Sequence, residues 1–369
     1  MAITSAVYAS LFSSAASAGS VDFSFLAKSS SSTATTANVG SVKSALVNAE
    51  KNEAKQLAQV AKDPQIQKDL ARYEKVVKNA KSIDDVLNDP VARAVLMTAN
   101  GLKGDINNIA LAKKAMTSDP NNANSVAVKM SSINGAWLDF AKTYNLAQNG
   151  LDALSPQNNG AAGRWRLSFD REGENIEAML EITKVRGGGY QAEVDGVPVP
   201  VTIDGNSIKL DLLWRDSADE LRTSTFNGTL GKTGLSGTFT NDGETKPATW
   251  SAPAYFADAI KGVRDNYIAE KRLDMLDAQM PGLGSAVLFK QSASTFENAI
   301  DILGSPLARE VVTTAFNIPK QIAVQSLSAQ EKAITQRMNP AKLQNAHFAD
   351  QIAQRYLIML NGGLGGVTA

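Results

Sequence analysis

The sequence predicts a multidomain α+β protein: a discontinuous all-helical domain, built from two related halves, carries an inserted antiparallel β-barrel or β-sandwich of about eight strands. Apolar residues recur at three- and four-residue spacing over 42–160 and again over 254–361, as in amphipathic helices. Between residues 163 and 252 the apolar period changes to two, as in half-buried strands. An internal sequence similarity relates the two helical segments.

The composition excludes several kinds of site and partner. The chain has 369 residues, with 37 Lys and Arg against 37 Asp and Glu, one His and no Cys. The lack of cysteine excludes disulfides, a cysteine nucleophile and thiolate-bound metal. A net charge of zero argues against nucleic acid as the main partner, because binding to phosphates needs a basic excess. No window approaches the roughly 20 apolar residues of a transmembrane helix, so we expect no transmembrane segment.

Residues 1–41 are expected to be a disordered segment for export or assembly. The first 40 residues hold only two charged side chains, Asp22 and Lys28. An uncharged, serine-rich start is typical of an uncleaved flagellar-type export signal and of any loose terminus, and no basic residue supports a cleaved secretory signal. Large apolar side chains in this segment are the candidate assembly contacts: Leu11, Phe12, Phe23, Phe25 and Leu26.

Helical half one, residues 42–160, shows clear start and stop signals. Asp63-Pro64 and Asp89-Pro90 each place a capping side chain before a proline at the first helical position. Gly101 suits a left-handed helix end. A later apolar stripe at helical spacing predicts one long amphipathic helix through Met130, Ile133, Trp137, Phe140 and Tyr144.

The β-module, residues 163–252, is expected to be an antiparallel meander. Its apolar runs alternate with polar residues, and Asp195-Gly196 is one of several tight-turn signals that separate them. Trp165 and Trp214 are in phase with aliphatic neighbours, which favours a place in the core over stacking on a sugar; we expect the same of Trp250. Three arginines are candidate surface contacts for a partner: Arg164, Arg166 and Arg222.

Helical half two, residues 254–361, repeats the signals of half one, and residues 362–369 are expected to be a flexible tail. Ser305-Pro306 and Asn339-Pro340 are further helix starts, and Ser328 with Glu331 predicts a capping box. The segment Asp301–Arg309 aligns with Asp85–Arg93 without a gap. Self-similarity of this kind indicates related units that stack on each other, although chance similarity of two capped helices is the alternative.

Motifs for catalysis or metal binding are weak. The sole histidine, His347, precedes Asp350 by one helical turn, but a catalytic or metal site would need further groups from elsewhere. Gly187-Gly188-Gly189 lacks the lysine and the helix of a phosphate-binding loop, which favours a flexible hairpin. The sequence therefore predicts no catalytic residue, no cofactor-binding or metal-binding residue, no cofactor and no enzymatic activity.

The two helical segments resemble a bacterial family called domain of unknown function 1217 (DUF1217). The residues that carry the resemblance are Arg72–Ala80, Ile83–Pro90, Ala99–Leu102, Thr117–Pro120 and Asn124-Ser125, then Asn266–Ile268, Ala286–Phe289 and the helices from Ile300 to Ile318. Genes of this family commonly lie among the flagellar genes of alphaproteobacteria. The resemblance therefore implies a flagellum-associated protein exported by the flagellar route, and it supplies no catalytic residues. The β-module departs from the simpler members.

These observations favour a non-enzymatic structural or interaction protein, extracellular and flagellum-associated. Its expected partners are other flagellar proteins or further copies of itself, with the helical body used for assembly and the β-module as the partner-facing surface. The alternative is a secreted or periplasmic binding module whose β-barrel holds a glycan or a small apolar ligand.

Overall fold

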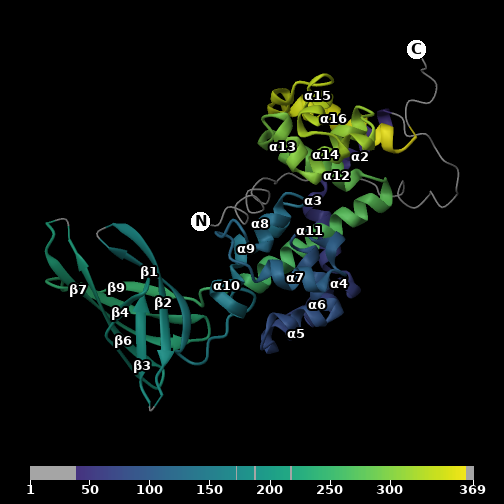
Figure 1. Cartoon of the computed structure of the whole chain (residues 1–369). Coiled ribbons are helices and arrows are strands. Elements are labelled where there is room, and N and C mark those ends of the chain that lie inside the picture. The colour runs from purple at the N-terminus through teal and green to yellow at the C-terminus, as the bar shows by residue number, and fades with distance from the viewer. Residues whose placement is uncertain (1–38, 172, 187, 217, 363–369) are drawn as a thin grey trace. The chain divides into compact units, whose positions relative to one another are not determined.

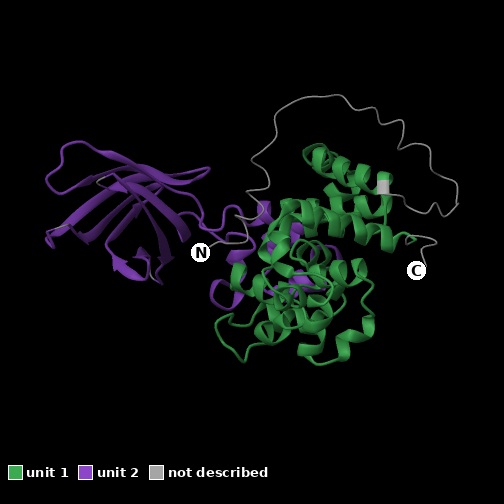
Figure 2. Cartoon of the chain, turned by 90° about the horizontal axis from the view of Figure 1, so that it is seen from above, with its two compact units in different colours: residues 1–72, 93–145, 263–369 green, residues 73–92, 146–262 purple. Residues whose placement is uncertain are grey.

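A computed structural model describes residues 39–362 apart from residues 172, 187 and 217. Within this range the chain forms two compact units, which Figure 2 colours separately. The first unit comprises residues 39–72, 93–145 and 263–362, and the second comprises residues 73–92 and 146–262. The predicted segments 1–41 and 362–369 lie almost wholly outside the described residues.

Helices precede and follow a single sheet in the chain (Figure 1). Those before the sheet are α2 (Val39–Lys51), α3 (Glu53–Ala61), α4 (Pro64–Asn79), α5 (Ile83–Asn88), α6 (Pro90–Thr98), η2 (Lys103–Asp105), α7 (Ile109–Met116), α8 (Val126–Ser131), α9 (Ala136–Tyr144), α10 (Leu146–Asn149) and η3 (Gly150–Ala153). Those after it are α11 (Ala259–Gln279), α12 (Leu283–Ser292), η4 (Ala293–Thr295), α13 (Ala299–Gly304), α14 (Pro306–Ala315), η5 (Lys320–Val324), α15 (Leu327–Thr335), η6 (Pro340–Gln344) and α16 (Ala346–Leu360).

The sheet is an antiparallel meander, as predicted, in the order β4-β3-β2-β1-β9-β8-β7-β6-β5. Its strands are β1 (Gly163–Arg171), β2 (Glu174–Lys184), β3 (Tyr190–Val194), β4 (Val197–Val199), β5 (Val201–Asp204), β6 (Ser207–Arg215), β7 (Leu221–Gly231), β8 (Gly234–Asn241) and β9 (Ala248–Ala252). The helical segments with an inserted antiparallel module confirm the predicted fold class.

The sheet closes into a nearly complete barrel at Pro200. The two ends of the sheet, β4 and β5, come from one continuous stretch of chain, in which Val197 pairs with Val194 on β3 and Val201 pairs with Leu210 on β6. Proline has no N–H to donate to a ladder, so the stretch changes pairing partner at Pro200. Val197, Val199, Val201 and Ile203 alternate with polar or proline residues, a period that predicts one strand, and the break explains why the sheet has nine strands rather than about eight.

Aromatic side chains fill the barrel interior. Phe226 stacks on Phe239 with ring centroids 4.9 Å apart, and Phe169 meets both rings edge-on at 5.0 and 5.2 Å. Trp250 meets Phe226 edge-on at 5.8 Å. Trp165 and Trp250 are 4% and 3% exposed, which confirms their predicted place in the core.

Trp250 also lies over a pair of glycines on β7 and β8. Gly228 pairs with Gly237, which in turn pairs with Trp250. A Cβ atom at Gly228 would lie 2.5 Å from the indole carbon Cζ2 of Trp250 and 2.5 Å from the backbone oxygen of Ser236. Only glycine therefore allows the indole to approach the sheet at this position.

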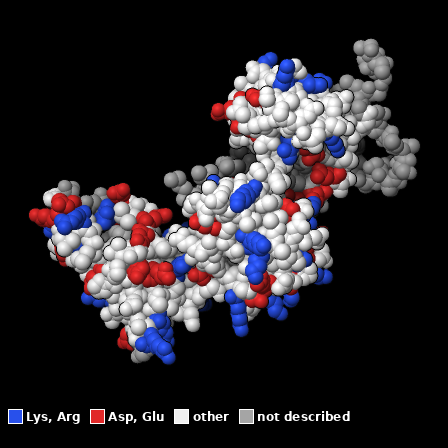
Figure 3. Space-filling model, viewed as in Figure 1, with Lys and Arg blue, Asp and Glu red and all other residues white. Residues whose placement is uncertain are grey.

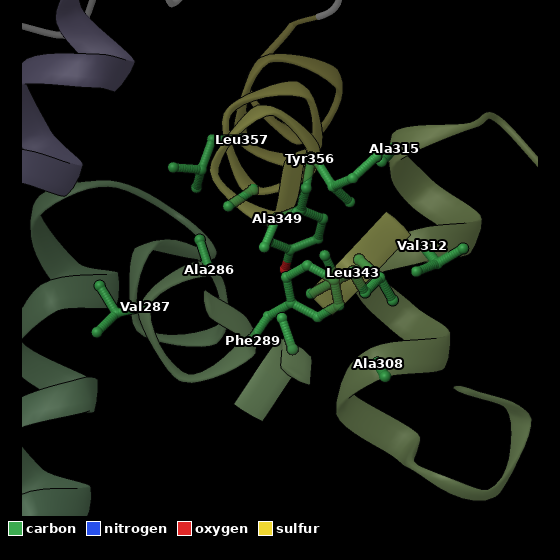
Figure 4. Close-up of a cluster of buried hydrophobic side chains, with 14 of the residues drawn as sticks. Ala286, Val287, Phe289, Ala308, Val312, Ala315, Leu343, Ala349, Tyr356 and Leu357 are labelled. Atoms are coloured by element: carbon green, nitrogen blue, oxygen red, sulfur yellow. The ribbon is translucent and has the colours of Figure 1, made fainter. Parts of the chain in front are cut away.

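The core of the second helical half includes a helix from the first. Buried residues of α12, α14 and α16 pack together, and Figure 4 shows Phe289, Val312 and Tyr356 among them. Val42 and Leu46 of α2 belong to the same buried cluster, and they are 0% and 1% exposed. The start of half one thus completes the core of half two.

Matched helix caps support the relation between the halves. Asp85 and Asp301 each close a capping box at the start of α5 and α13. Each half later ends a helix in a left-handed residue, Gly101 with φ 71° and Asn317 with φ 49°. After each, a backbone N–H bonds to the carbonyl five residues earlier at 2.8 Å, from Leu102 and from Ile318. The aligned segments therefore share local backbone structure.

One buried arginine joins the first helices to α11. Arg272 is 3% exposed, and its guanidinium donates to Glu53 Oε1 at 3.0 Å, to Gln56 Oε1 at 2.9 Å and to the backbone oxygen of Ala49 at 2.6 Å. A buried cation is tolerated only when it is paired and hydrogen-bonded in this way. Arg272 therefore fixes α2 and α3 against α11.

Two helical predictions were wrong in detail. The stripe predicted as one helix is split into α8 and α9, and Ile133 between them is 65% exposed. The reason is a start signal within the stripe: Asn134 Oδ1 accepts from the N–H of Ala136 at 3.1 Å, next to Gly135. Helix α15 is capped by Ser326, not by Ser328.

We expect Gly228→Ala to destabilise the β-module by about 1–3 kcal/mol, because its methyl group would overlap Trp250. Chemical unfolding followed by near-ultraviolet circular dichroism measures the change. Gly231→Ala is the matched control, since a Cβ there meets only Gly234 O at an ordinary 3.7 Å. Equal effects of the two substitutions would contradict the packing of Trp250 on Gly228.

We expect Arg272→Ala to lower the free energy of unfolding of the helical unit by about 3–5 kcal/mol, because it leaves the half-buried Glu53 and Gln56 and the buried carbonyl of Ala49 without their donor. Urea unfolding followed by far-ultraviolet circular dichroism measures this loss. Arg264→Ala, at an exposed position of the same helix, should change stability by less than about 0.5 kcal/mol. A small effect at Arg272 would show that the contact does not hold the helices together.

Candidate functional site

Polar side chains gather at one end of the barrel, where β6 meets β7. Trp214 lies directly opposite Arg222, and Leu212 lies directly opposite Ser224. Opposite residues share a face of the sheet, so Trp214 and Arg222 extend the inward-facing rows of β6 and β7. Trp214 is half-buried, so its predicted place in the core was only partly right. We call Trp214, Ser224, Asn241, Arg222 and Arg171 the barrel-end cluster.

A chain of hydrogen bonds closes the interior at this end. The Trp214 indole Nε1 donates to Ser224 Oγ at 2.9 Å, and the Ser224 hydroxyl donates to Asn241 Oδ1 at 2.6 Å. Asn241 Nδ2 then donates to Glu244 Oε2 at 3.1 Å. Ser224 is fully buried, so these bonds satisfy a hydroxyl that would otherwise be costly.

The side chain of Arg222 is paired with two carboxylates of the neighbouring hairpin. Its Nε donates to Asp216 Oδ2 at 2.8 Å and its Nη2 to Glu220 Oε2 at 2.7 Å. The hydrogen bond from Arg222, with further bonds from the N–H groups of Glu220 and Ala218, lowers the pKa of Asp216. Arg222, which was predicted as a contact for a partner, therefore stabilises the loop between β6 and β7.

Arg171 completes the cluster from the other side of the barrel. Its guanidinium carbon lies 4.4 Å from the centroid of the Trp214 ring. The strands that carry the two residues, β1 and β6, are not neighbours in the sheet, so this cation–π contact crosses the barrel end. Arg171 was not among the predicted contact residues, although it continues the inward alternation of Trp165, Leu167 and Phe169.

The other predicted arginines lie toward the opposite end of the barrel. Arg164 Nε donates to Glu181 Oε2 at 3.3 Å. Arg166 Nη2 donates to the backbone oxygen of Tyr255 at 2.9 Å, and its guanidinium carbon lies 5.7 Å from the Tyr255 ring centroid. The three predicted arginines therefore do not form one surface. The predicted assembly contacts Leu11, Phe12, Phe23, Phe25 and Leu26 lie outside the described residues.

A second cluster of charges surrounds Glu270 on α11. Burial, together with the charge of Asp274, raises the pKa of Glu270 to about 7, and Lys103 and Lys271 oppose the rise. Lys103 and Lys271 each form an ion pair with Asp274. A raised carboxyl pKa is common at catalytic sites and also in structural ion-pair networks. No nucleophile accompanies this carboxyl among these contacts, so the geometry favours a structural role.

The histidine motif is not assembled. His347 lies in the first turn of α16, where its backbone N–H donates to the capping Asn345 at 2.9 Å. Asp350 pairs instead with Lys290, at 2.5 Å. Within residues 39–362, the described part of the chain holds no group of three or more His, Asp or Glu side chains placed to bind a metal ion.

We expect Glu270→Gln to remove a pH dependence of stability. The ordinary pKa of a glutamate is 4.5 and that of folded Glu270 is about 7, so between these values the folded state binds a proton that the unfolded state has released. The contribution of Glu270 to stability therefore falls as the pH rises through this window. At pH ~8 the variant should be more stable than the parent by about 1–3 kcal/mol.

Urea unfolding at several pH values measures this difference. Glu297→Gln, at an exposed glutamate, is the matched control and should leave the pH profile unchanged. A parent protein that gains stability relative to Glu270→Gln as the pH rises would contradict the assigned environment of Glu270.

None of the described helices is both long and apolar enough to cross a membrane. No curated protein matches the chain. Among solved structures, the X-ray crystal structure of protein AGR_C_984 from Agrobacterium tumefaciens is similar, with 17% identity and a TM-score of 0.49 over 89% of this chain and 96% of that chain.

A family model described as "Protein of unknown function (DUF1217)" matches residues 99–162 and 233–348. The unmatched stretch between these segments holds strands β1 to β7, and the match resumes at the turn before β8. The last two strands of the barrel are thus part of the matched region, and the inserted stretch is shorter than the whole β-module. Because these two segments match the family model, the chain belongs to the DUF1217 family, with an insertion in the middle of the family region.

Proposed function

We propose that this protein is a non-enzymatic, flagellum-associated structural or interaction protein, exported by the flagellar route. In this proposal the helical body supports assembly, and the β-module presents a surface to other flagellar proteins or to further copies of the chain. The protein acts outside the cell. The family resemblance and the composition of residues 1–41 motivate the flagellar part of the proposal.

The filled interior of the β-module is the observation that carries the interaction role. Phe169, Phe226, Phe239 and Trp250 occupy the space that a ligand would need, and all are nearly fully buried. Small barrels of this kind are commonly filled by their own side chains. The alternative, a secreted or periplasmic module that holds a glycan or apolar ligand inside the barrel, is therefore the weaker one.

The described surface also suits contacts with proteins. Lys and Arg are interspersed with Asp and Glu over the face in Figure 3, which is unlike the basic stripe of a nucleic-acid-binding protein. Large apolar side chains remain exposed, including Val324 at 89% and Leu327 at 55% in the helical unit, and Leu213 at 58% and Leu221 at 61% in the β-module. Exposed apolar groups of this size are candidates for burial in an assembly.

Localisation of the tagged, full-length protein in its native host tests the proposal. We expect the protein outside wild-type cells and in flagellar preparations, and we expect it to be retained in a strain that lacks the flagellar export gate. A cytoplasmic protein of known location is the control for lysis. Retention in both strains, or equal export from both, would contradict flagellar export.

A further inference from the structure

Arg171 is a half-buried cation whose charge the described structure leaves unpaired. Among the described residues its guanidinium forms no ion pair, and its guanidinium carbon lies 4.4 Å from the centroid of the Trp214 ring. The nearest carboxylate by strand register is Glu174, directly opposite on β2, which is exposed and forms no ion pair with Arg171. Stacking on a ring leaves the guanidinium N–H groups at its edge available for an acceptor.

The other two arginines at this end of the barrel, Arg215 and Arg222, already have partners. Arg222 is paired with Asp216 and Glu220, and Arg215 Nη1 donates to the backbone oxygen of Asp219 at 2.7 Å. Arg171 therefore differs from its neighbours. Partly buried arginines are normally paired, because removing a charge from water is costly without a partner.

Two exposed leucines lie beside the pair along the same strands, but on the outer face of the barrel, whereas Trp214 and Arg222 belong to the inward-facing rows. Leu213 precedes Trp214 on β6, and Leu221 precedes Arg222 on β7. Leu213 lies opposite Thr223, so Leu221 is its diagonal neighbour two residues away. Of these residue types, arginine and tryptophan are the ones enriched in interaction hot spots.

We propose that the Arg171–Trp214 pair at the barrel end is the recognition point of the β-module, and that it binds a carboxylate side chain of a partner protein. A carboxylate accepts two parallel hydrogen bonds from one guanidinium. This inference rests on the proposed interaction role and names the chemistry of the partner.

Charge favours a carboxylate over a phosphate group. Asp216, Asp219 and Glu220 lie on the adjoining hairpin, and they add negative charge to this end of the barrel. A phosphate that carries nearly two charges would be repelled more strongly than a carboxylate that carries one. A single free guanidinium thus suits a glutamate or aspartate side chain.

Titration of the full-length protein with two blocked dipeptides tests the proposal. The probes are N-acetyl-Leu-Glu-amide and N-acetyl-Leu-Gln-amide, which differ only in the charge of one side chain. Binding is followed by nitrogen-15 NMR of the arginine Nε–H groups. We expect the glutamate probe to shift the Arg171 signal and to bind at least about tenfold more tightly than the glutamine probe.

Variants assign the effect to the two residues. Arg171→Ala should abolish the preference for the glutamate probe, and Trp214→Phe, which keeps a ring at this position, should weaken binding by about two- to fivefold. Arg215→Ala is the matched control at the same end of the barrel and should bind as the parent does. Circular dichroism of each variant verifies that the barrel remains folded.

Equal affinity for both probes, an unchanged preference in folded Arg171→Ala, or tighter binding of inorganic phosphate than of the glutamate probe would overturn the proposal. The titration needs neither export nor a flagellum. If the localisation test fails and the titration succeeds, the flagellar role is wrong and the carboxylate site stands. If the localisation test succeeds and the titration fails, only the carboxylate site is wrong.

Discussion

The burial of Arg272 is the interaction on which the helical unit depends. Its guanidinium satisfies acceptors on α2 and α3 while its backbone belongs to α11, so helices from the two halves are fixed against each other. With α2 held there, Val42 and Leu46 complete the core of the second half. Helix α11 also contacts the first half directly, because Tyr267 of α11 donates a hydrogen bond to Asp69 of α4 at 3.0 Å. The first helix of the first half thus packs in the core of the second half, and α11 contributes Leu273 and Leu276 to the same core while it contacts α4 through Tyr267.

The β-module follows a different constraint, which is closure of a small sheet. At Pro200 one stretch of chain changes from one edge of the sheet to the other, and aromatic side chains then meet inside and fill the interior. Polar and charged side chains that could contact a partner therefore lie at the barrel ends and on the outer face. Arg171 and Trp214 meet at such an end because β1 and β6, far apart in sheet order, face each other across a closed barrel.

Local sequence signals predicted most of the fold and little of the candidate site. Helix starts such as Asp63-Pro64 and Ser305-Pro306, and the alternation of β1, were predictable because they depend on neighbours in the chain. The split between α8 and α9 was missed because an apolar stripe outweighed the capping signal of Asn134. Arg272 and Arg171 could not be identified, since their roles depend on Glu53 and Trp214, which are distant in sequence and become neighbours only after folding.

The place of α2 in the core of the second half is the central structural claim, and hydrogen exchange measured by mass spectrometry across increasing urea tests it most directly. The account predicts that peptides from α2 lose protection together with peptides from α12 and α16, whose core they complete. Loss of protection in α2 together with α7 and α9, while α12 and α16 stay protected, would contradict it. That result would mean that α2 is stabilised by the first half alone, and that the hydrogen bonds of Arg272 do not hold α2 in the core of the second half.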